Sequence, residues 1–198
     1  MITRASGSGN VAALTFDDGP NGATTERLLD FLGDHGIPAV FCVIGESILA
    51  PGGAAVLRRI VGEGHLLCNH TTSYADMGDW DAARIEADLL ANLAIIREAL
   101  GDPEFVVPYF RAPNGSWGQT AAVAEQLGMR SLAVINAIQD WETQDAETLV
   151  ANLRAAMRPG ELVLAHDGGG DRENTVDAVI TVVTERLAEG WQFTLPAG

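Results

Sequence analysis

The chain alternates from end to end between short apolar runs and longer amphipathic stretches. The apolar runs lack strict apolar–polar alternation, which is typical of parallel strands covered on both faces. The stretches between them repeat apolar residues at a spacing of three or four, as helices with one buried face do. Seven strands are predicted, at residues 11–16, 38–45, 65–70, 105–110, 131–138, 162–165 and 191–195. Helices are predicted between them, at residues 24–32, 53–62, 82–100, 119–127, 146–157 and 174–188.

This alternation predicts an α/β fold, because right-handed crossovers through helices produce a parallel sheet. Periodicity alone does not separate an open doubly wound sheet from a closed barrel. In both architectures, functional sites form outside the C-terminal ends of the strands. The length of 198 residues suits one domain with a full core, so we expect a single domain over residues 1–198.

Polar residues able to carry chemistry gather at the predicted strand ends. They lie in segments 17–18, 69–74, 111–115, 139–141 and 166–171. Loops that only face solvent do not need so many such groups, and their concentration at one edge indicates a site. The first segment holds two adjacent carboxylates, Asp17 and Asp18, followed by a Gly-Pro turn. Successive side chains on a strand point to opposite faces, so both carboxylates share one site only if the chain leaves strand geometry there.

Composition and charge narrow the classes of partner. The AVILMFWYC residues make up 47% of the chain and the charged residues 20%, which is globular composition. The formal net charge of −15 repels phosphate backbones and anionic lipids, so neither a nucleic acid nor a membrane is expected as partner. The chain begins without the pattern of a signal peptide and is predicted to be cytoplasmic, although a removed leader would leave no trace. The oligomeric state is not readable from the sequence.

The strand-end segments carry five short motifs that together resemble a known family. The motifs are TFDDGP at 15–20, NHTTS at 69–73, RAPNG at 111–115, QDW at 139–141 and LAHD at 164–167. In this order they resemble the motifs of the polysaccharide deacetylases, the NodB-type carbohydrate esterases of family 4. The resemblance spans essentially the whole chain. It implies a distorted (β/α)7 barrel that hydrolyses an acetyl group from an amino sugar or sugar ester with a divalent metal, usually zinc.

The resemblance also implies roles for individual residues. Asp17 would be the general base that activates water, and Arg111 would keep it ionised and oriented. His166 would be the general acid that protonates the leaving group. Asp18 and His70 would be metal ligands. These roles agree with elementary chemistry, because an adjacent guanidinium lowers the pKa of a carboxylate and an imidazole can return a proton near neutral pH.

Other residues are expected to bind the substrate, an acetylated carbohydrate or small molecule. The resemblance places the backbone N–H of Asn114 at the oxyanion and makes Pro113, Trp141 and Leu164 substrate-binding residues. The glycines at 168–170 predict a loop that borders the pocket.

The sequence departs from the family at the third metal ligand. The family has a second histidine four residues after the first, and here that position holds Tyr74. A phenol with a pKa of about 10 is a poor zinc ligand unless the metal deprotonates it. Asp76 or Asp79 could reach the metal instead and would favour harder cations. An intact divalent-metal site and a metal-poor site therefore both stay open.

A second departure concerns the acid. The family motif Asp-x-x-Asp-Trp, whose first Asp orients the acid histidine, aligns with Ala137 to Trp141. His166 is therefore predicted to lack its carboxylate partner, which would disfavour its imidazolium form. An amide needs leaving-group protonation more than an ester does, so this substitution favours an ester or small-molecule substrate.

Three hypotheses result. The first is a hydrolase that removes an acetyl group by metal-assisted water attack. The second is a catalytically impaired relative that still binds carbohydrate. The third is a metal-free hydrolase of a non-sugar C–N bond.

Overall fold

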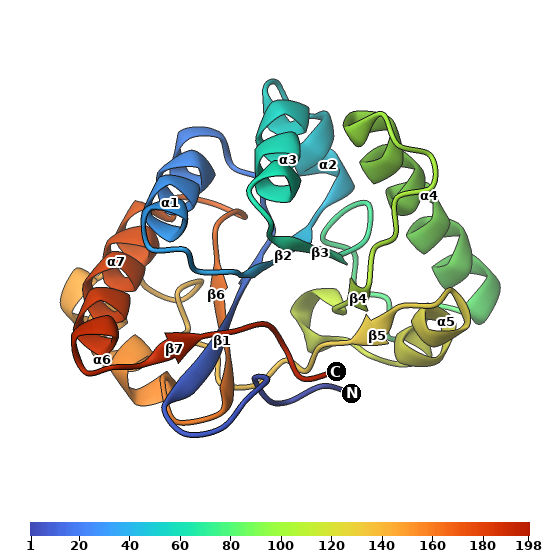
Figure 1. Ribbon diagram of the computed structural model, residues 1–198. Coiled ribbons are helices and arrows are strands. Elements are labelled where there is room, and N and C mark those ends of the chain that lie inside the picture. The colour runs from blue at the N-terminus through green and yellow to red at the C-terminus, as the bar shows by residue number, and fades with distance from the viewer.

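The computed structural model describes residues 1–198 and shows a curved parallel sheet with helices around its outer side (Figure 1). The sheet has seven strands in the order β5-β4-β3-β2-β1-β6, and β7 pairs with β1. The strands are β1 (Val11–Asp17), β2 (Val40–Val43), β3 (Leu66–Asn69), β4 (Tyr109–Phe110), β5 (Arg130–Ser131), β6 (Glu161–His166) and β7 (Gln192–Phe193). The helices are α1 (Gly22–Asp34), α2 (Gly45–Leu49), α3 (Gly53–Gly62), α4 (Ala82–Leu100), α5 (Thr120–Gln126), α6 (Ala146–Ala156) and α7 (Glu173–Ala188), with a 3-10 turn η1 (Pro113–Gly115).

Every residue of β1 is buried, as its continuous apolar run predicts. One edge of β1 pairs with β6 along most of its length, and its upper half pairs with β2 on the other side. The register sets Asp17 beside Cys42 of β2 and beside His166 of β6. Parallel pairing therefore brings the first and sixth strand ends to the same edge, where both carry a titratable side chain.

The period of two along the strands divides the core into an outer and an inner part. Alternate residues of β1, among them Leu14 and Phe16, belong to the large cluster under the helices. Val11 and Ala13 belong to a smaller cluster inside the barrel. Asp17 has the parity of Val11 and Ala13, so its side chain faces the barrel interior. The same parity assigns inward positions on other strands to His70, Arg111, Leu164 and His166.

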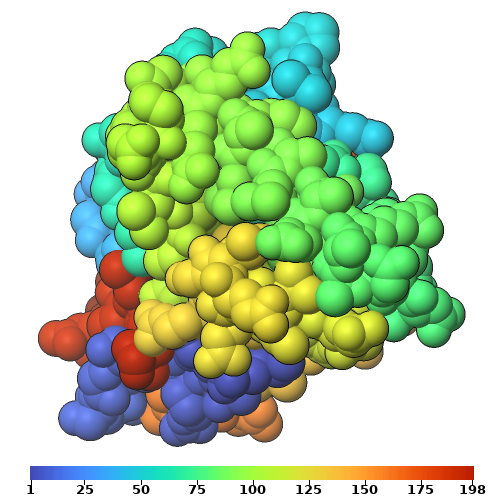
Figure 2. Space-filling model, turned by 90° about the vertical axis from the view of Figure 1, so that its right-hand side faces the viewer, coloured from blue at the N-terminus to red at the C-terminus, as the bar shows by residue number.

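The sheet closes into a distorted barrel with the help of the chain termini. No ladder joins β5 to β6, but isolated parallel bridges link Ile2 to Leu132 and Ala137 to Leu164. Antiparallel bridges join Arg4 to Glu161 and Ala5 to Pro196. The two ends of the chain accordingly lie side by side at the base of the molecule (Figures 1 and 2). The parallel α/β barrel implied by the motifs is confirmed.

Two predicted strands are much shorter than expected. The run at 105–110 pairs only at Tyr109 and Phe110, because Pro108 before them has no N–H to donate to a ladder. The run at 131–138 keeps only Ser131 in β5, and Asn136 has a φ of 54°, which breaks strand geometry. One helix, α2, follows β2 and was not predicted. No helix has both the length and the apolarity needed to cross a bilayer.

Candidate active site

The end of β1 turns so that its two carboxylates share one site. Asp17 closes the strand and faces the barrel interior, and Asp18 follows with a φ of 75°. A non-glycine residue in this left-handed region is uncommon and often marks a functional turn. Five residues are of this kind, and four of them, Asp18, Thr71, Asn114 and Gln139, lie in loops at the C-terminal edge of the sheet, whereas Asn136 lies beside the first half of β6.

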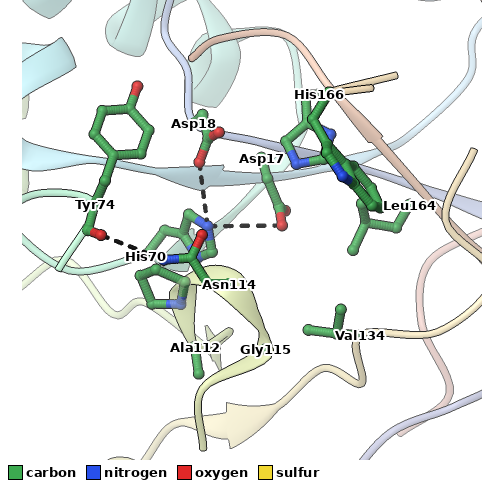
Figure 3. A pocket seen from close by; sticks show the side chains of 12 residues that line it. Asp17, Asp18, His70, Tyr74, Ala112, Asn114, Gly115, Val134, Leu164 and His166 are labelled. Carbon is green, nitrogen blue, oxygen red and sulfur yellow. Dashed lines mark hydrogen bonds and ion pairs between the residues drawn. The ribbon is translucent and has the colours of Figure 1, made fainter. Parts of the chain in front are cut away.

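A cavity of about 350 Å³ opens at this edge of the barrel (Figure 3). Its walls include all three predicted metal ligands. They also include every residue that was predicted to act on the substrate or to bind it, with the exception of Arg111. The lining residues are Asp17, Asp18, His70, Tyr74, Ala112, Pro113, Asn114, Gly115, Val134, Trp141, Leu164 and His166. The sequence did not single out Ala112, Gly115 and Val134. The volume lies within the range of small-molecule sites.

Arg111 lies directly beneath the cavity and is fully buried. Its Nη1 donates to Asp17 Oδ1 at 2.6 Å and to Thr15 Oγ1 at 2.9 Å. Burial alone would raise the pKa of Asp17, but the charges of Arg111, His70 and His166 outweigh burial and hold that pKa below its ordinary value. Asp17 is therefore ionised at neutral pH, as a general base must be. Removing either partner of such a buried pair would cost about 3–5 kcal/mol of stability.

His70 contacts the two carboxylates through one ring nitrogen. Its Nδ1 lies 2.7 Å from the carbonyl oxygen of Arg111, a contact that requires Nδ1 to carry a proton and to donate. Its Nε2 lies 3.3 Å from Asp18 Oδ1 and 3.7 Å from Asp17 Oδ2 (Figure 3). The lone pair of Nε2 thus faces two carboxylate oxygens, and a proton on Nε2 or a metal ion stabilises that arrangement.

His166 has a carboxylate partner, so the prediction that it lacks one is wrong. Its Nδ1 lies 2.7 Å from Asp140 Oδ1, and its backbone N–H donates to Asp140 Oδ2 at 2.8 Å. Thr175 donates a third hydrogen bond to Asp140, which is fully buried. The left-handed residues Asn136 and Gln139 turn the segment away from strand geometry, so that Asp140 reaches His166 in place of Ala137.

The pairing sets the protonation of His166. Burial lowers the pKa of the imidazole, but the hydrogen bond and negative charge of Asp140 raise it above the ordinary value. The imidazolium form therefore persists to higher pH than in a free histidine. The ring of Trp141 lies edge-on to His166, with 5.5 Å between centroids, and forms the outer rim of the cavity. This histidine is equipped to donate a proton.

The sequence of the chain is similar to those of known proteins. The family described as polysaccharide deacetylase matches residues 4–132. A chitooligosaccharide deacetylase of Bradyrhizobium sp. (strain ANU 289) is 35% identical over 187 residues, which are 93% of this chain and 82% of the relative. The chain belongs to the polysaccharide deacetylase family.

Solved structures agree with this membership. A peptidoglycan N-acetylglucosamine deacetylase in complex with 4-naphthalen-1-yl-N-oxidanyl-benzamide has a TM-score of 0.83 and 26% identity, covering 97% of this chain and 88% of its own. A family 4 acetyl xylan esterase from Clostridium thermocellum, in complex with a cobalt ion, has a TM-score of 0.81 and 28% identity, covering 93% and 87%. Members of the polysaccharide deacetylase family thus hold a metal ion in at least one solved case.

The third metal ligand expected of the family is not supplied by Tyr74. Its hydroxyl points away from His70 (Figure 3). The residue is 44% exposed. Burial and the charge of Asp18 also raise the pKa of Tyr74, which disfavours the phenolate that would bind a metal. Asp76 accepts hydrogen bonds from Ser116 and from the backbone of Gly78, and neither Asp76 nor Asp79 lines the cavity.

The remaining donors fit a divalent cation only in part. Asp18 and His70 offer an oxygen and a nitrogen, and the contact of His70 Nδ1 with a carbonyl oxygen is the usual support of a metal-binding histidine. No group of three or more His, Cys, Asp or Glu side chains is arranged to hold a metal. A catalytic zinc site ordinarily has three protein ligands, so a cation here would bind more weakly than in a complete site.

The loop after His166 packs against Asp18 and holds Asp140 in place. A Cβ added to Gly169 would lie 2.5 Å from Asp18 Oδ2, so only glycine allows the loop to pack against that carboxylate. Arg172 is buried and donates to the backbone oxygens of Gly168, Gly169 and Asp140 at 2.9, 3.2 and 2.8 Å. Its guanidinium thus fixes this loop and the position of Asp140 together.

Some supporting residues were missed because their partners lie far away in sequence. Asp88 of α4 accepts hydrogen bonds from both the backbone and the hydroxyl of Thr72. Asn92 of the same helix donates to Asn69 Oδ1 at 2.8 Å, and Asn69 Oδ1 also accepts from the backbone of Thr71. A buried asparagine on an otherwise apolar helix face was the available signal. Together these contacts hold the loop that carries His70.

Proposed function

We propose that the protein is a hydrolase that removes the acetyl group from an N-acetylated sugar by attack of water. The observation that carries the proposal is the pairing of each titrating group with its own charged partner on one cavity. Asp17 is held ionised by Arg111, and His166 is held protonated by Asp140. A base and an acid of opposite protonation state in one cavity are what hydrolysis of an amide requires.

The first step uses Asp17. A water molecule beside its carboxylate attacks the acetyl carbonyl carbon, and Asp17 accepts the proton that the water loses. Negative charge develops on the former carbonyl oxygen. Asn114 lines the cavity and its backbone N–H makes no hydrogen bond within the chain, so this N–H would donate to that oxygen.

The second step uses His166. As the carbon–nitrogen bond breaks, the electron pair leaves with nitrogen, and His166 gives its proton to that atom. Asp140 stabilises the imidazolium before the transfer and fixes the ring through Nδ1. The products are acetate and a free amine. A leaving amine needs this proton, and the presence of Asp140 removes the argument from the sequence that favoured esters over amides.

Asp18 and His70 would hold a divalent cation in this site, and zinc is the metal proposed from the family. When bound, such a cation polarises the carbonyl and lowers the pKa of water. Because this chain supplies two ligands, we expect the purified protein to contain less than one equivalent of metal and to respond to added zinc or cobalt.

The acetyl group would occupy the apolar side of the cavity. Leu164, Val134 and Pro113 offer apolar surface there, and Trp141 is 51% exposed at the rim. The relatives are named as deacetylases of chitooligosaccharides and of peptidoglycan N-acetylglucosamine, which supports an acetylated carbohydrate as substrate. The net charge of −15 further favours a neutral substrate over an anionic one.

A second candidate is a relative that binds carbohydrate without hydrolysing it. The orientation of Tyr74 favours this candidate, since a site with too few ligands could lose its metal and its chemistry together. The aromatic groups at the cavity would still bind a sugar ring.

Metal-dependent turnover separates the candidates. The chelated and dialysed protein is assayed on acetylated chito-oligosaccharides, alone and after addition of zinc or cobalt, while calorimetry follows oligosaccharide binding. We expect acetate release that depends on added metal. Binding without any release of acetate would support the non-catalytic relative. Turnover that a chelator leaves unchanged would point instead to a metal-free hydrolase.

A further inference from the structure

Two loops at the catalytic cavity are joined to each other by contacts of their own. The first, residues 74–80, lies between β3 and α4, and the second, residues 113–118, lies between β4 and α5. The second loop carries Asn114, whose backbone N–H is proposed to donate to the oxyanion. The first loop carries Tyr74, which does not supply the third metal ligand. None of the contacts between the two loops has a role in the two steps proposed above.

The backbone of the 113–118 loop needs support from outside the loop. Asn114, Gly115 and Gly118 have φ values of 57°, 64° and 43°. This left-handed region is unfavourable for a residue with a Cβ, and glycine populates other regions about as readily, so an isolated segment of this sequence would sample many conformations. The N–H groups of Gly115 and Ser116 donate to backbone oxygens of the same turn at 3.2 and 3.0 Å. A fixed direction for the N–H of Asn114 requires further contacts.

Hydrogen bonds from the 74–80 loop supply such contacts. Ser116 Oγ donates to Asp76 Oδ1, and the backbone N–H of Gly78 lies 3.1 Å from Ser116 Oγ and 3.2 Å from Asp76 Oδ1. The hydrogen bonds from Ser116 and Gly78 hold the pKa of Asp76 below its ordinary value, so its carboxylate is ionised at neutral pH. Asn114 Nδ2 also donates to the backbone oxygen of Tyr74 at 3.4 Å. We call the contacts among Asp76, Gly78 and Ser116 the loop clasp.

The backbones of the two loops also pack closely against each other. A Cβ added to Gly118 would collide with the carbonyl oxygen of Gly78, and a Cβ added to Gly78 would collide with Ser116 Oγ. Glycine at both positions therefore allows the loops to approach this closely. Each loop also has an anchor, since Met77 is fully buried in the main core and Trp117 packs against the same core. The loop clasp thus joins two segments that are each tied to the core.

We propose that the loop clasp positions the backbone N–H of Asn114 for the oxyanion, with Asp76 and Ser116 as positioning residues. This inference rests on the proposed function, because it concerns the hydrogen-bond donor of the first step. A donor that is already aimed at the developing charge needs no reorganisation during the reaction. The loop that bears Tyr74 therefore has a role in catalysis that does not involve binding a metal.

The 74–80 loop offers a matched pair of variants for the test. Asp76→Ala removes the carboxylate of the loop clasp, and Asp79→Ala is the control, because Asp79 is exposed in the same loop and takes no part in the clasp. Both substitutions remove one negative charge, so a difference between them reports the hydrogen bonds. Asp76→Asn keeps an oxygen that accepts from Ser116 and Gly78, and it tests for rescue. Each variant is assayed on an N-acetylated sugar with saturating zinc or cobalt.

We expect Asp76→Ala to lower kcat about tenfold and to leave KM within about twofold. Loss of a whole oxyanion donor lowers kcat about 100- to 1000-fold, and a loosened loop loses part of that effect. Asp79→Ala should keep kcat within about twofold, and Asp76→Asn should keep it within about threefold. Ser116→Ala should cause the same loss as Asp76→Ala, and the double variant should lose no more than either one, because both substitutions break the same interaction.

Amide hydrogen exchange measures the order of the 113–118 loop without any turnover. In Asp76→Ala the N–H groups of Gly115 and Ser116 should exchange at least about tenfold faster than in the wild type, because their turn loses its support from the other loop. Asp79→Ala should leave their exchange unchanged. Thermal unfolding of both variants checks that the fold as a whole is kept.

Three results would overturn the inference: unchanged exchange or unchanged kcat in Asp76→Ala, equal changes in Asp76→Ala and Asp79→Ala, or a double variant that loses the product of the two single losses. If the wild type hydrolyses no N-acetylated sugar, the proposed function fails, and amide exchange alone tests the loop clasp. Exchange that Asp76→Ala accelerates and Asp79→Ala does not would still support the clasp, and equal exchange in both variants would contradict it.

Discussion

The pairing of Asp140 with His166 can be tested by Asp140→Asn. The carboxylate accepts three hydrogen bonds in the buried site, from His166 Nδ1, from the His166 backbone and from Thr175. Asparagine has nearly the same shape but no charge, and it can accept at one atom only. Its NH2 group would then face another donor, so the variant loses both the charge and part of the hydrogen bonding.

The size of the effect follows from the distance and the burial. A carboxylate in contact with an imidazolium raises its pKa by about 1–3 units, each worth about 1.4 kcal/mol. Asp140 acts on His166 from 2.7 Å within a buried site and is one of the causes that raise the pKa of His166. Without it, the pKa of His166 falls, and a smaller fraction of this imidazole is protonated above neutral pH. We therefore expect kcat on an N-acetylated sugar to fall about 100-fold, within the range for loss of a general acid.

The assay compares two leaving groups across pH. Since the pKa of His166 is raised in the wild type, activity is retained below that pKa and lost as pH rises through it. In Asp140→Asn the alkaline limb of the kcat/KM profile on the amide should move to lower pH, because the negative charge that raises the pKa of His166 is gone. An aryl acetate, whose leaving group needs no proton, should lose less than about fivefold. Thr175→Val removes one donor to Asp140 and keeps its charge, so it should leave the alkaline limb at or above its wild-type pH.

The reasoning is refuted if Asp140→Asn hydrolyses the amide at a rate within twofold of the wild type with an unmoved alkaline limb. Equal losses on the amide and on the aryl acetate would also refute it, because they would indicate a disturbed cavity rather than a missing proton. Circular dichroism and thermal unfolding of the variant exclude a loss caused by unfolding.

Three further predictions concern the metal, the glycine loop and stability. Tyr74→His should restore the third ligand, raising the zinc content after dialysis towards one equivalent, as elemental analysis would measure; unchanged zinc would mean that the loop does not bring position 74 to His70. Gly169→Ala should displace Asp18, because its Cβ would collide with Oδ2, and should lower metal affinity about tenfold or more by calorimetry; unaltered affinity would contradict the close packing. Asp167 is buried, and burial raises its pKa to about 7, so the folded state keeps a proton that the unfolded chain releases near pH 4. Its contribution to stability is thus present at low pH and declines as pH rises from about 4 to about 7. The free energy of unfolding of Asp167→Asn, measured by denaturant titration, should gain about 2–4 kcal/mol relative to that of the wild type between pH 4 and 8. A difference that stays constant with pH would show that the carboxyl is not protonated.

The positions of most cavity residues could be predicted from the sequence because two simple regularities combine. Parallel strands end at one edge, and side chains alternate in direction along each strand. Asp17, Leu164 and His166 lie on strands that form as predicted and have their inward parity, and Arg111 directly follows the short β4 with the inward parity of Tyr109. Where the strand pattern was regular, knowing the last residue of a strand was enough to place its side chain at the cavity.

The remainder could not be predicted because it lies where the chain leaves regular structure. Alternation fails between 132 and 141, where Asn136 and Gln139 adopt positive φ and bring Asp140 to His166. The direction of Tyr74 depends on a loop held by contacts with distant residues, such as Asn114. Neither feature follows from a repeating pattern of residues along the chain, so only the three-dimensional structure reveals it. Alignment with the family motif therefore pointed to Ala137, whereas the carboxylate partner of His166 is Asp140.

Acetate release by the wild type and by Asp17→Asn tests the central claim most directly. Both proteins are incubated with an N-acetylglucosamine oligomer and saturating zinc or cobalt, and acetate and free amine are quantified over time. The account predicts equal amounts of acetate and amine from the wild type and a rate at least about 100-fold lower from Asp17→Asn, because the base is gone while the shape of the site is kept. Release of acetate by both proteins at the same rate, or by neither, would contradict it.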